Sequence, residues 1–153
     1  MIRQLSKHFT LQEFLHSQTA ARVGIVQRLP DALWPNLQRL VDTILEPIRE
    51  TLNTPIHVSS GYRDRVVNSL VGGAANSAHM DARAADITTS AWTAPELARL
   101  IQQMNLPGMH KCILEFGSWV HVSIAEDNET PLRQYMHAKR VHGRTIYEVG
   151  FGD

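Results

Sequence analysis

The segment from Lys111 to Ile124 constrains the fold more than any other part of this 153-residue chain. Two runs rich in apolar and β-branched residues, 111–116 and 119–124, are separated only by Gly117 and Ser118, which predicts a tight β-hairpin. Successive side chains of a strand point to opposite faces of the sheet. We therefore expect the second strand to place Val120, Val122 and Ile124 in the core and Trp119, His121 and Ser123 toward a cleft.

Helical segments are expected mainly in the N-terminal third. Residues 10–13 form a capping box, which predicts a short helix ending near Ser17, with a second brief turn through Ala21. Apolar residues at helical spacing from Leu33 to Ile48 predict the main helix. Pro47 cannot donate to the hydrogen-bond ladder and should kink or end that helix.

The remaining segments predict shorter elements: strands at 55–60, 84–88 and 145–149, and helices at 66–71 and 93–104. These elements predict an α+β fold, with helices packed on one side of a mainly antiparallel sheet. By length, residues 1–153 form one domain, with N-terminal helices at about 10–52 and a catalytic sheet region at about 55–150.

Composition excludes several classes of partner. Lys plus Arg and Asp plus Glu balance at 15 each, so no global positive field favours nucleic acid. No segment has the length and apolarity of a signal peptide or a membrane span, which predicts cytoplasmic synthesis without membrane insertion. The single Cys112 lies in an apolar run and is expected to be a buried, inert thiol. The chain is expected to be a monomer.

Two short motifs carry the chemistry. His79 and Asp86 lie in the segment 77–86, and His121 follows in a Trp-x-His motif. Two imidazoles and one carboxylate are the ligands of a catalytic zinc site, in which the fourth position is left for water. Zinc lowers the pKa of that water to roughly 7. The pattern predicts a Zn²⁺ metallohydrolase.

The surrounding sequence resembles the zinc D-alanyl-D-alanine carboxypeptidase family, peptidoglycan peptidases that include phage endolysins. The resemblance extends over about residues 6–125, and Ala82 stands where that family usually has Gly. It rests on the patterns S-x-Y-R, N-x-x-V-G-G, S-x-H-x-x-G-x-A-x-D and W-x-H, matched by Ser60, Tyr62, Arg63, Asn68, Val71, Gly72, Gly73, Ser77, His79, Ala84, Asp86, Trp119 and His121.

The resemblance implies a hedgehog/D-Ala-D-Ala metallopeptidase fold and an enzyme that acts on the cell wall after release, as a phage or prophage lysis enzyme does. It also implies that Arg63 stabilises an oxyanion. Many relatives have an acidic general base three residues before the last histidine, where this chain has Ser118. Glu115 is the nearest acid upstream and is our candidate base. Ser77, Tyr62 and Trp119 are candidates for substrate binding, although Ser77 could instead close its loop and Tyr62 could be architectural.

The sequence leaves the cleaved bond open. A D-Ala-D-Ala carboxypeptidase and an endopeptidase at the L-Ala-D-Glu bond or at a cross-link both fit the resemblance. Two alternatives of another kind remain, a non-catalytic zinc-containing wall-binding module and a component of a phage tail.

Overall fold

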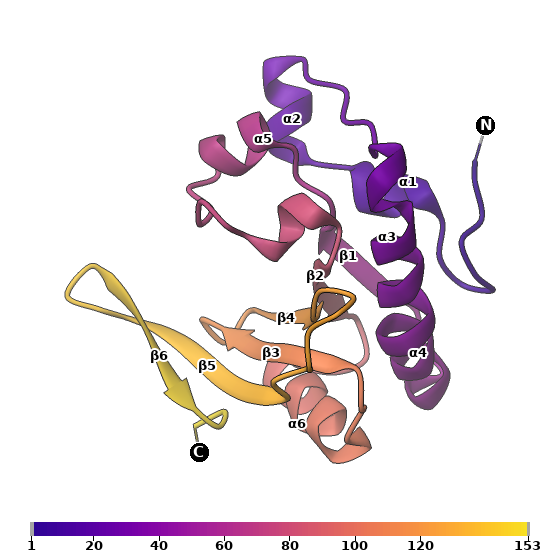
Figure 1. The fold of residues 1–153 in the computed structure, drawn as a ribbon. Coiled ribbons are helices and arrows are strands. Elements are labelled where there is room, and N and C mark those ends of the chain that lie inside the picture. The colour runs from indigo at the N-terminus through magenta and orange to yellow at the C-terminus, as the bar shows by residue number, and fades with distance from the viewer. Residues whose placement is uncertain (1, 153) are drawn as a thin grey trace.

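The computed structural model describes residues 2–152 and has a six-stranded sheet at its centre (Figure 1). The strand order is β1-β2-β4-β3-β5-β6, and every neighbouring pair is antiparallel except β3 and β5. The strands are β1 (Ile56–Ser60), β2 (Ala84–Thr89), β3 (Met109–Glu115), β4 (Trp119–Ile124), β5 (Gln134–Val141) and β6 (Arg144–Val149). The predicted α+β class and mainly antiparallel sheet are confirmed.

The helices also agree with the sequence pattern. Both predicted capping boxes form, at Thr10 before α1 (Leu11–Leu15) and at Thr93 before α6 (Ala94–Met104). Ser17 caps α2 (Gln18–Val23) through its side chain, and Asp64 caps α5 (Arg65–Leu70) in the same way. Two 3-10 turns complete the set, η1 (Asp31–Leu33) and η3 (Ala78–Asp81).

The main helix continues past Pro47 instead of ending there. It consists of α3 (Trp34–Leu40), a π-helical turn η2 (Val41–Leu45) and α4 (Glu46–Leu52). The amide of Glu46 bonds to the carbonyl of Val41, five residues earlier. This wider turn places Pro47 in the first turn of α4, where a missing N–H costs no hydrogen bond.

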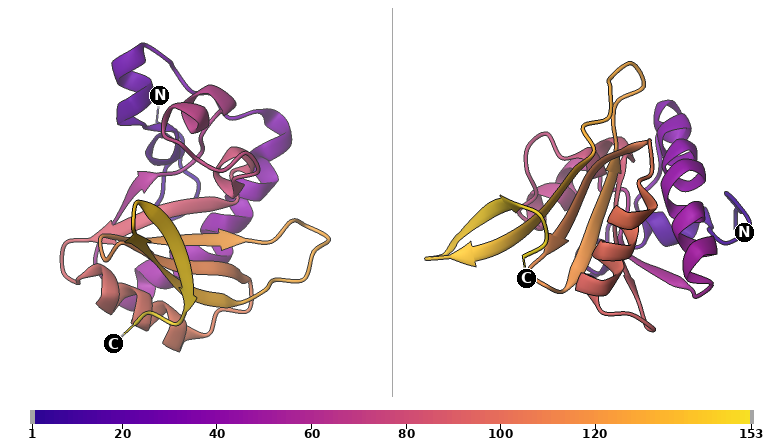
Figure 2. Two further views of the ribbon diagram at one scale, coloured as in Figure 1. Left: turned by 90° about the vertical axis from the view of Figure 1, so that its left-hand side faces the viewer. Right: turned by 90° about the horizontal axis from the view of Figure 1, so that it is seen from below.

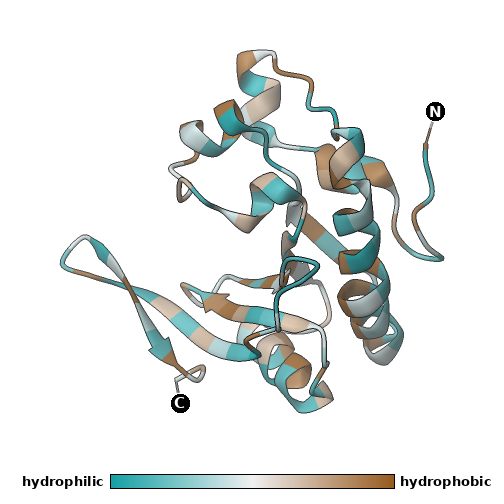
Figure 3. Cartoon of the chain, viewed as in Figure 1, coloured by the Kyte–Doolittle hydropathy of each residue, from teal (hydrophilic) through white to brown (hydrophobic). Residues whose placement is uncertain are grey.

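The helices α3, α4 and α6 cover one face of the sheet (Figure 2). Val120, Val122 and Ile124 of β4 are buried on that face, as predicted. Hydrophobic bands alternate with hydrophilic ones along the strands and helices, as a sheet with one covered face requires (Figure 3). Cys112 is fully buried in this core, and burial raises the pKa of its thiol to about 12. Within residues 2–152, no helix is both long and apolar enough to cross a membrane.

The C-terminal hairpin of β5 and β6 is larger than the sequence pattern predicted. Only the second strand was expected. The four polar residues among the eight of β5 do not alternate strictly with apolar ones, so the sequence pattern offered no strand signal there. The signal that the pattern did offer is the dipeptide His142–Gly143, in which both residues have positive φ. That is the geometry of a two-residue hairpin turn. The hairpin projects away from the body of the molecule (Figures 1 and 2).

Candidate metal centre

Three predicted ligands, His79, Asp86 and His121, converge on the face of the sheet opposite α6. Asp86 in β2 and His121 in β4 are directly paired across the sheet, and His79 arrives from η3. Atom Oδ1 of Asp86 lies 3.0 Å from Nδ1 of His121 and 3.3 Å from Nε2 of His79. One ligand atom from each side chain lies within 4.8 Å of the other two. The geometry brings the predicted ligand set together.

The orientation of His79 is fixed by the backbone carbonyl of Gly61. Its Nδ1 lies 2.7 Å from that oxygen. Because a carbonyl only accepts hydrogen bonds, Nδ1 carries the proton and the lone pair of Nε2 points toward Asp86. Gly61 is required here by close approach, since a Cβ at this position would lie 2.7 Å from the backbone of Phe14 in α1. No sequence pattern predicted this carbonyl contact.

The residues of this group fit a zinc ion. Nitrogen, nitrogen and carboxylate oxygen are ligands that zinc prefers, and three protein ligands are the number that a catalytic site uses. Burial opposes the charge of Asp86, but His79 and His121 outweigh it and hold the pKa of that carboxyl well below its usual range. The side chains of the three residues are between 3% and 13% exposed, so they are shielded yet reachable.

Arg63 lies beside this group and forms no ion pair with any described residue. Its Nη2 donates to the hydroxyl of Ser77 at 3.3 Å, and its Nε is buried without a partner in residues 2–152. Burial lowers the pKa of Arg63, while the charges of Asp86 and Glu115 raise it. The guanidinium is therefore partly desolvated and lies within electrostatic reach of both carboxylates.

Ser77 closes its loop and contacts Arg63 as well. Its oxygen accepts a hydrogen bond from the amide of His79 at 3.2 Å, which caps η3, and it also receives the contact from Arg63. Ser77 thus links the candidate ligand His79 to the neighbouring cation Arg63. The architectural function expected of this hydroxyl is present in the structure.

Glu115 lies at the end of β3, opposite Trp119 in the adjacent strand β4. A three-residue loop, 116–118, gives this register. The predicted two-residue turn at Gly117–Ser118 would have paired Phe116 with Trp119 and turned Glu115 to the core face. Burial and the charge of Asp86 raise the pKa of Glu115, and His121 and Arg63 lower it. Glu115 is half-buried and interacts electrostatically with the ligands and with Arg63. A carboxyl group of raised pKa beside a metal site has the properties of a general base.

Tyr62 and Asn68 support the loops around the centre. Tyr62 is 7% exposed and belongs to the hydrophobic core, which places most of its ring away from solvent. The side chain of Asn68 donates to the carbonyl of Ala74 and packs against Gly73, where a Cβ would lie 2.1 Å from the Asn68 amide oxygen. These contacts shape the segment that leads to Ser77 and His79.

Ala82 has left-handed backbone geometry, with φ of 57°. It ends η3, and it is the one position where the sequence departs from the glycine of the pattern. The methyl group of Ala82 is buried in the core. The fold therefore tolerates Ala at a site whose conformation favours Gly.

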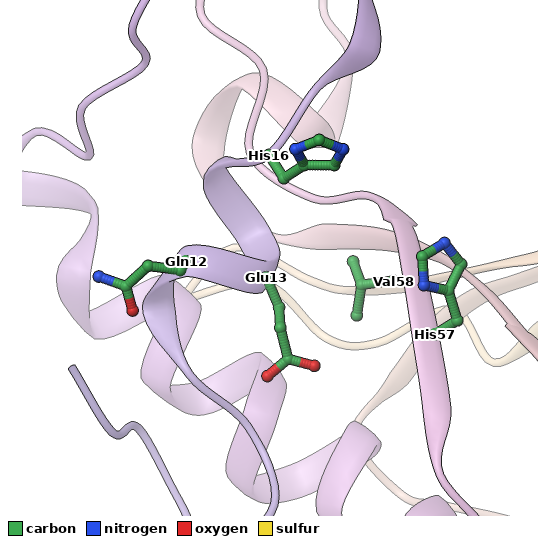
Figure 4. Close-up of a pocket in the computed structure, with 5 residues that line it drawn as sticks. All are labelled: Gln12, Glu13, His16, His57 and Val58. Carbon is green, nitrogen blue, oxygen red and sulfur yellow. The ribbon is translucent and has the colours of Figure 1, made fainter. Parts of the chain in front are cut away.

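A cavity of about 300 Å³ lies elsewhere, between α1 and β1 (Figure 4). It is lined by Gln12, Glu13, His16, His57 and Val58. Two histidines and a glutamate line this cavity, but their nitrogen and oxygen atoms do not lie close enough to one another to hold a metal ion. Over the described range 2–152, only His79, Asp86 and His121 form a group able to hold a metal.

Comparison with known proteins agrees with this geometry. No curated protein matches the chain. The Peptidase M15 family, in contrast, matches residues 7–123, a span that includes all three candidate ligands, Arg63 and Glu115. The match ends at the last residue but one of β4 and leaves the β5–β6 hairpin outside it. With most of its length covered, this chain belongs to the Peptidase M15 family of metallopeptidases.

Proposed function

We propose that this protein is a zinc-dependent peptidase that hydrolyses a peptide bond in the stem peptide of peptidoglycan. The bond is that of a D-Ala-D-Ala carboxypeptidase or of an endolysin-type endopeptidase. Membership of the M15 family supports the substrate class, and the His79, Asp86 and His121 group supports the metal. We further propose that the enzyme reaches the wall after release from the cytoplasm, as a phage or prophage lysis enzyme.

The observation that carries this proposal is a three-ligand centre with one unpaired cation and one acid of raised pKa beside it. A structural zinc site is closed by four protein ligands, whereas three ligands leave a position for chemistry. Arg63 and Glu115 both interact with Asp86, so they lie around the same point. A wall-binding module would need neither group.

Zinc, when bound by His79, Asp86 and His121, supplies a Lewis acid and lowers the pKa of water. Arg63 provides a fixed cation for the negative charge that develops on the carbonyl oxygen during attack. Its guanidinium is held by Ser77 and is partly desolvated, which strengthens its interaction with new charge. Because Arg63 has no ion-pair partner among residues 2–152, it does not have to break a salt bridge first.

Glu115 moves the proton in this mechanism. Its carboxylate accepts a proton from the attacking water and then delivers it to the nitrogen of the leaving amine. The raised pKa makes the Glu115 carboxylate a stronger base than an ordinary glutamate, which favours its taking the proton from the attacking water. Trp119 and Ser77 flank the path and are proposed to contact the substrate, while Tyr62 supports the loop from within the core.

Digestion of purified peptidoglycan by the zinc-loaded protein, followed by mass analysis of the products, tests the proposal. An endopeptidase should expose new amino groups without new reducing sugar ends and should clear permeabilised Gram-negative cells. A carboxypeptidase should release free D-Ala with little clearing, because trimming stem ends leaves the mesh intact. If fully zinc-loaded protein yields neither product, the peptidase proposal is wrong and a binding module takes its place.

A further inference from the structure

The β5–β6 hairpin extends the face of the sheet that carries the metal centre. Glu115 of β3 pairs with Ala138 of β5, and Ala138 pairs with Tyr147 of β6. Paired residues point to the same side of a sheet, and so do residues two apart in one strand. Tyr147 and Arg140 therefore lie on the face of Glu115.

Contacts between side chains support this placement. The guanidinium of Arg140 lies 5.2 Å from the ring centroid of Phe116, which follows Glu115. The ring of Phe116 in turn meets the ring of Trp119 edge-on, with centroids 5.7 Å apart. A continuous path of contacts thus leads from Arg140 to β4, the strand that carries His121.

Tyr147 lies in the edge strand β6, and Ala138 of β5 lies between it and Glu115, the proposed base. Tyr147 and Glu115 point to the same side of the sheet, because both are in register with the small, buried Ala138. Tyr147 is 57% exposed. Burial raises the pKa of Tyr147, and the charge of Glu115 raises it further, so the two groups sense each other. The face of the hairpin that carries Tyr147 and Arg140 is therefore continuous with the face of the sheet that carries the proposed base.

Arg140 is a cation without a carboxylate partner in the described part of the chain. The nearby acid, Glu148, lies on the opposite face of the hairpin, where it pairs with Lys139 at 2.7 Å and with His137 at 3.2 Å. Arg140 is exposed and rests on the Phe116 ring. A guanidinium over an aromatic ring uses no hydrogen-bond donor in that contact, so its donors stay free for a carboxylate, which it can bind with two parallel bonds.

We propose that Arg140 is a specificity-determining residue that binds a free carboxylate of the stem peptide, an inference that rests on the proposed peptidase function. Stem peptides carry carboxylates on their side branches and at their ends. On the hairpin face that continues from Glu115, Arg140 is a cation without an ion-pair partner among the described residues. Arg140 lies outside residues 7–123, the span that the family model matches.

The test compares Arg140→Gln with wild-type protein, both zinc-loaded, on a synthetic stem pentapeptide and on versions in which each carboxylate in turn is an amide. On the free-acid peptide, kcat/KM should fall about tenfold to a hundredfold, chiefly through KM, because one charge-assisted bidentate contact is lost. On the version whose relevant carboxylate is amidated, the two proteins should agree within about twofold.

Arg144→Gln is the matched control. It removes the same charge from the same hairpin. Arg144 precedes Tyr147 by an odd number of residues in β6, so its side chain lies on the opposite face of the sheet. It should cleave every peptide within about twofold of wild type. Phe116→Leu, which removes the ring under Arg140, should weaken cleavage of the free-acid peptide in the same direction and by less.

Equal losses on the acid and on every amidated peptide would overturn the inference, as would an equal loss from Arg144→Gln. If wild-type protein cleaves none of the peptides, the proposed function fails, and calorimetric binding of the same peptides then decides the role of Arg140 by itself. Weaker binding of the acid by Arg140→Gln alone would support it. Equal binding by wild type and variant would exclude it.

Discussion

Glu115 and Trp119 face each other across the β3–β4 hairpin, which places a half-buried carboxyl group beside the strand that carries the ligand His121. The three-residue loop 116–118 fixes this register, and Phe116 and Gly117 both adopt positive φ in it. The position three residues before His121 is occupied by Ser118, which is exposed and bonds to the carbonyl of Phe116. The candidate base therefore comes from β3, the partner strand of the hairpin, and not from the position three residues before His121.

Replacing Glu115 by Gln should abolish the proton shuttle and leave the fold intact. The amide keeps the size of the side chain but cannot accept the proton, so kcat should fall by about 10²- to 10⁴-fold. Steady-state kinetics on a stem peptide measures the loss, and zinc content and circular dichroism should stay unchanged. A variant that retained near-wild-type turnover would exclude Glu115 as the base.

The same substitution should stabilise the metal-free protein near neutral pH. Because the folded-state pKa of Glu115 is raised, the charged carboxylate costs stability above that pKa, and the cost disappears below the ordinary Glu pKa of about 4.3. Thermal unfolding in chelator should show a higher Tm for Glu115→Gln at pH 7, and the difference should shrink toward pH 4. Exposed Glu50→Gln is the control, and a pH-independent difference at residue 115 would contradict the account.

Arg63→Lys should reduce kcat more than it weakens substrate binding. Lysine keeps the charge but presents it as a point on a flexible stem, without the planar fork that Ser77 holds. A loss of roughly 10²- to 10³-fold in kcat is expected for a lost oxyanion contact. Arg65→Lys, at an exposed position two residues away, should behave as wild type. An unchanged kcat in Arg63→Lys would remove this residue from the mechanism.

Ala82→Gly should change stability little, because two effects offset each other. Relief of the left-handed conformation gains about 1–2 kcal/mol, while the loss of a buried methyl and the flexibility of Gly cost about 0.8 and 0.5–1 kcal/mol. Denaturant unfolding should show a net change within about 1 kcal/mol. Ala82→Val should be clearly destabilising, since a branched side chain at positive φ is strained. A stable Val variant would show that φ does not constrain this residue.

Sequence patterns predicted the elements whose signals are local. Both capping boxes and the alternation of β4 were predicted correctly because each depends on residues close together in the chain. The two short motifs also pointed to the three side chains that the fold brings together, His79, Asp86 and His121. Pro47 does not end the main helix, which was one of the two expected outcomes, because a π turn that only the packed helix reveals absorbs the missing hydrogen bond. Strand β5 was missed because its pairing with β3 is parallel and bridges a distant segment. The carbonyl of Gly61 carries no side-chain signal, so its contact with His79 was invisible to the pattern.

The zinc content of wild-type protein and of Asp86→Ala tests the central claim most directly. Elemental analysis after removal of free metal should find about one zinc per wild-type chain, as a three-ligand catalytic site binds a single ion. Asp86→Ala should lose most of this zinc, because Oδ1 of Asp86 is the atom that both His79 and His121 approach. Asp81→Ala, which alters an acid of the same motif outside the group, should keep it. A full equivalent of zinc in Asp86→Ala would contradict the account.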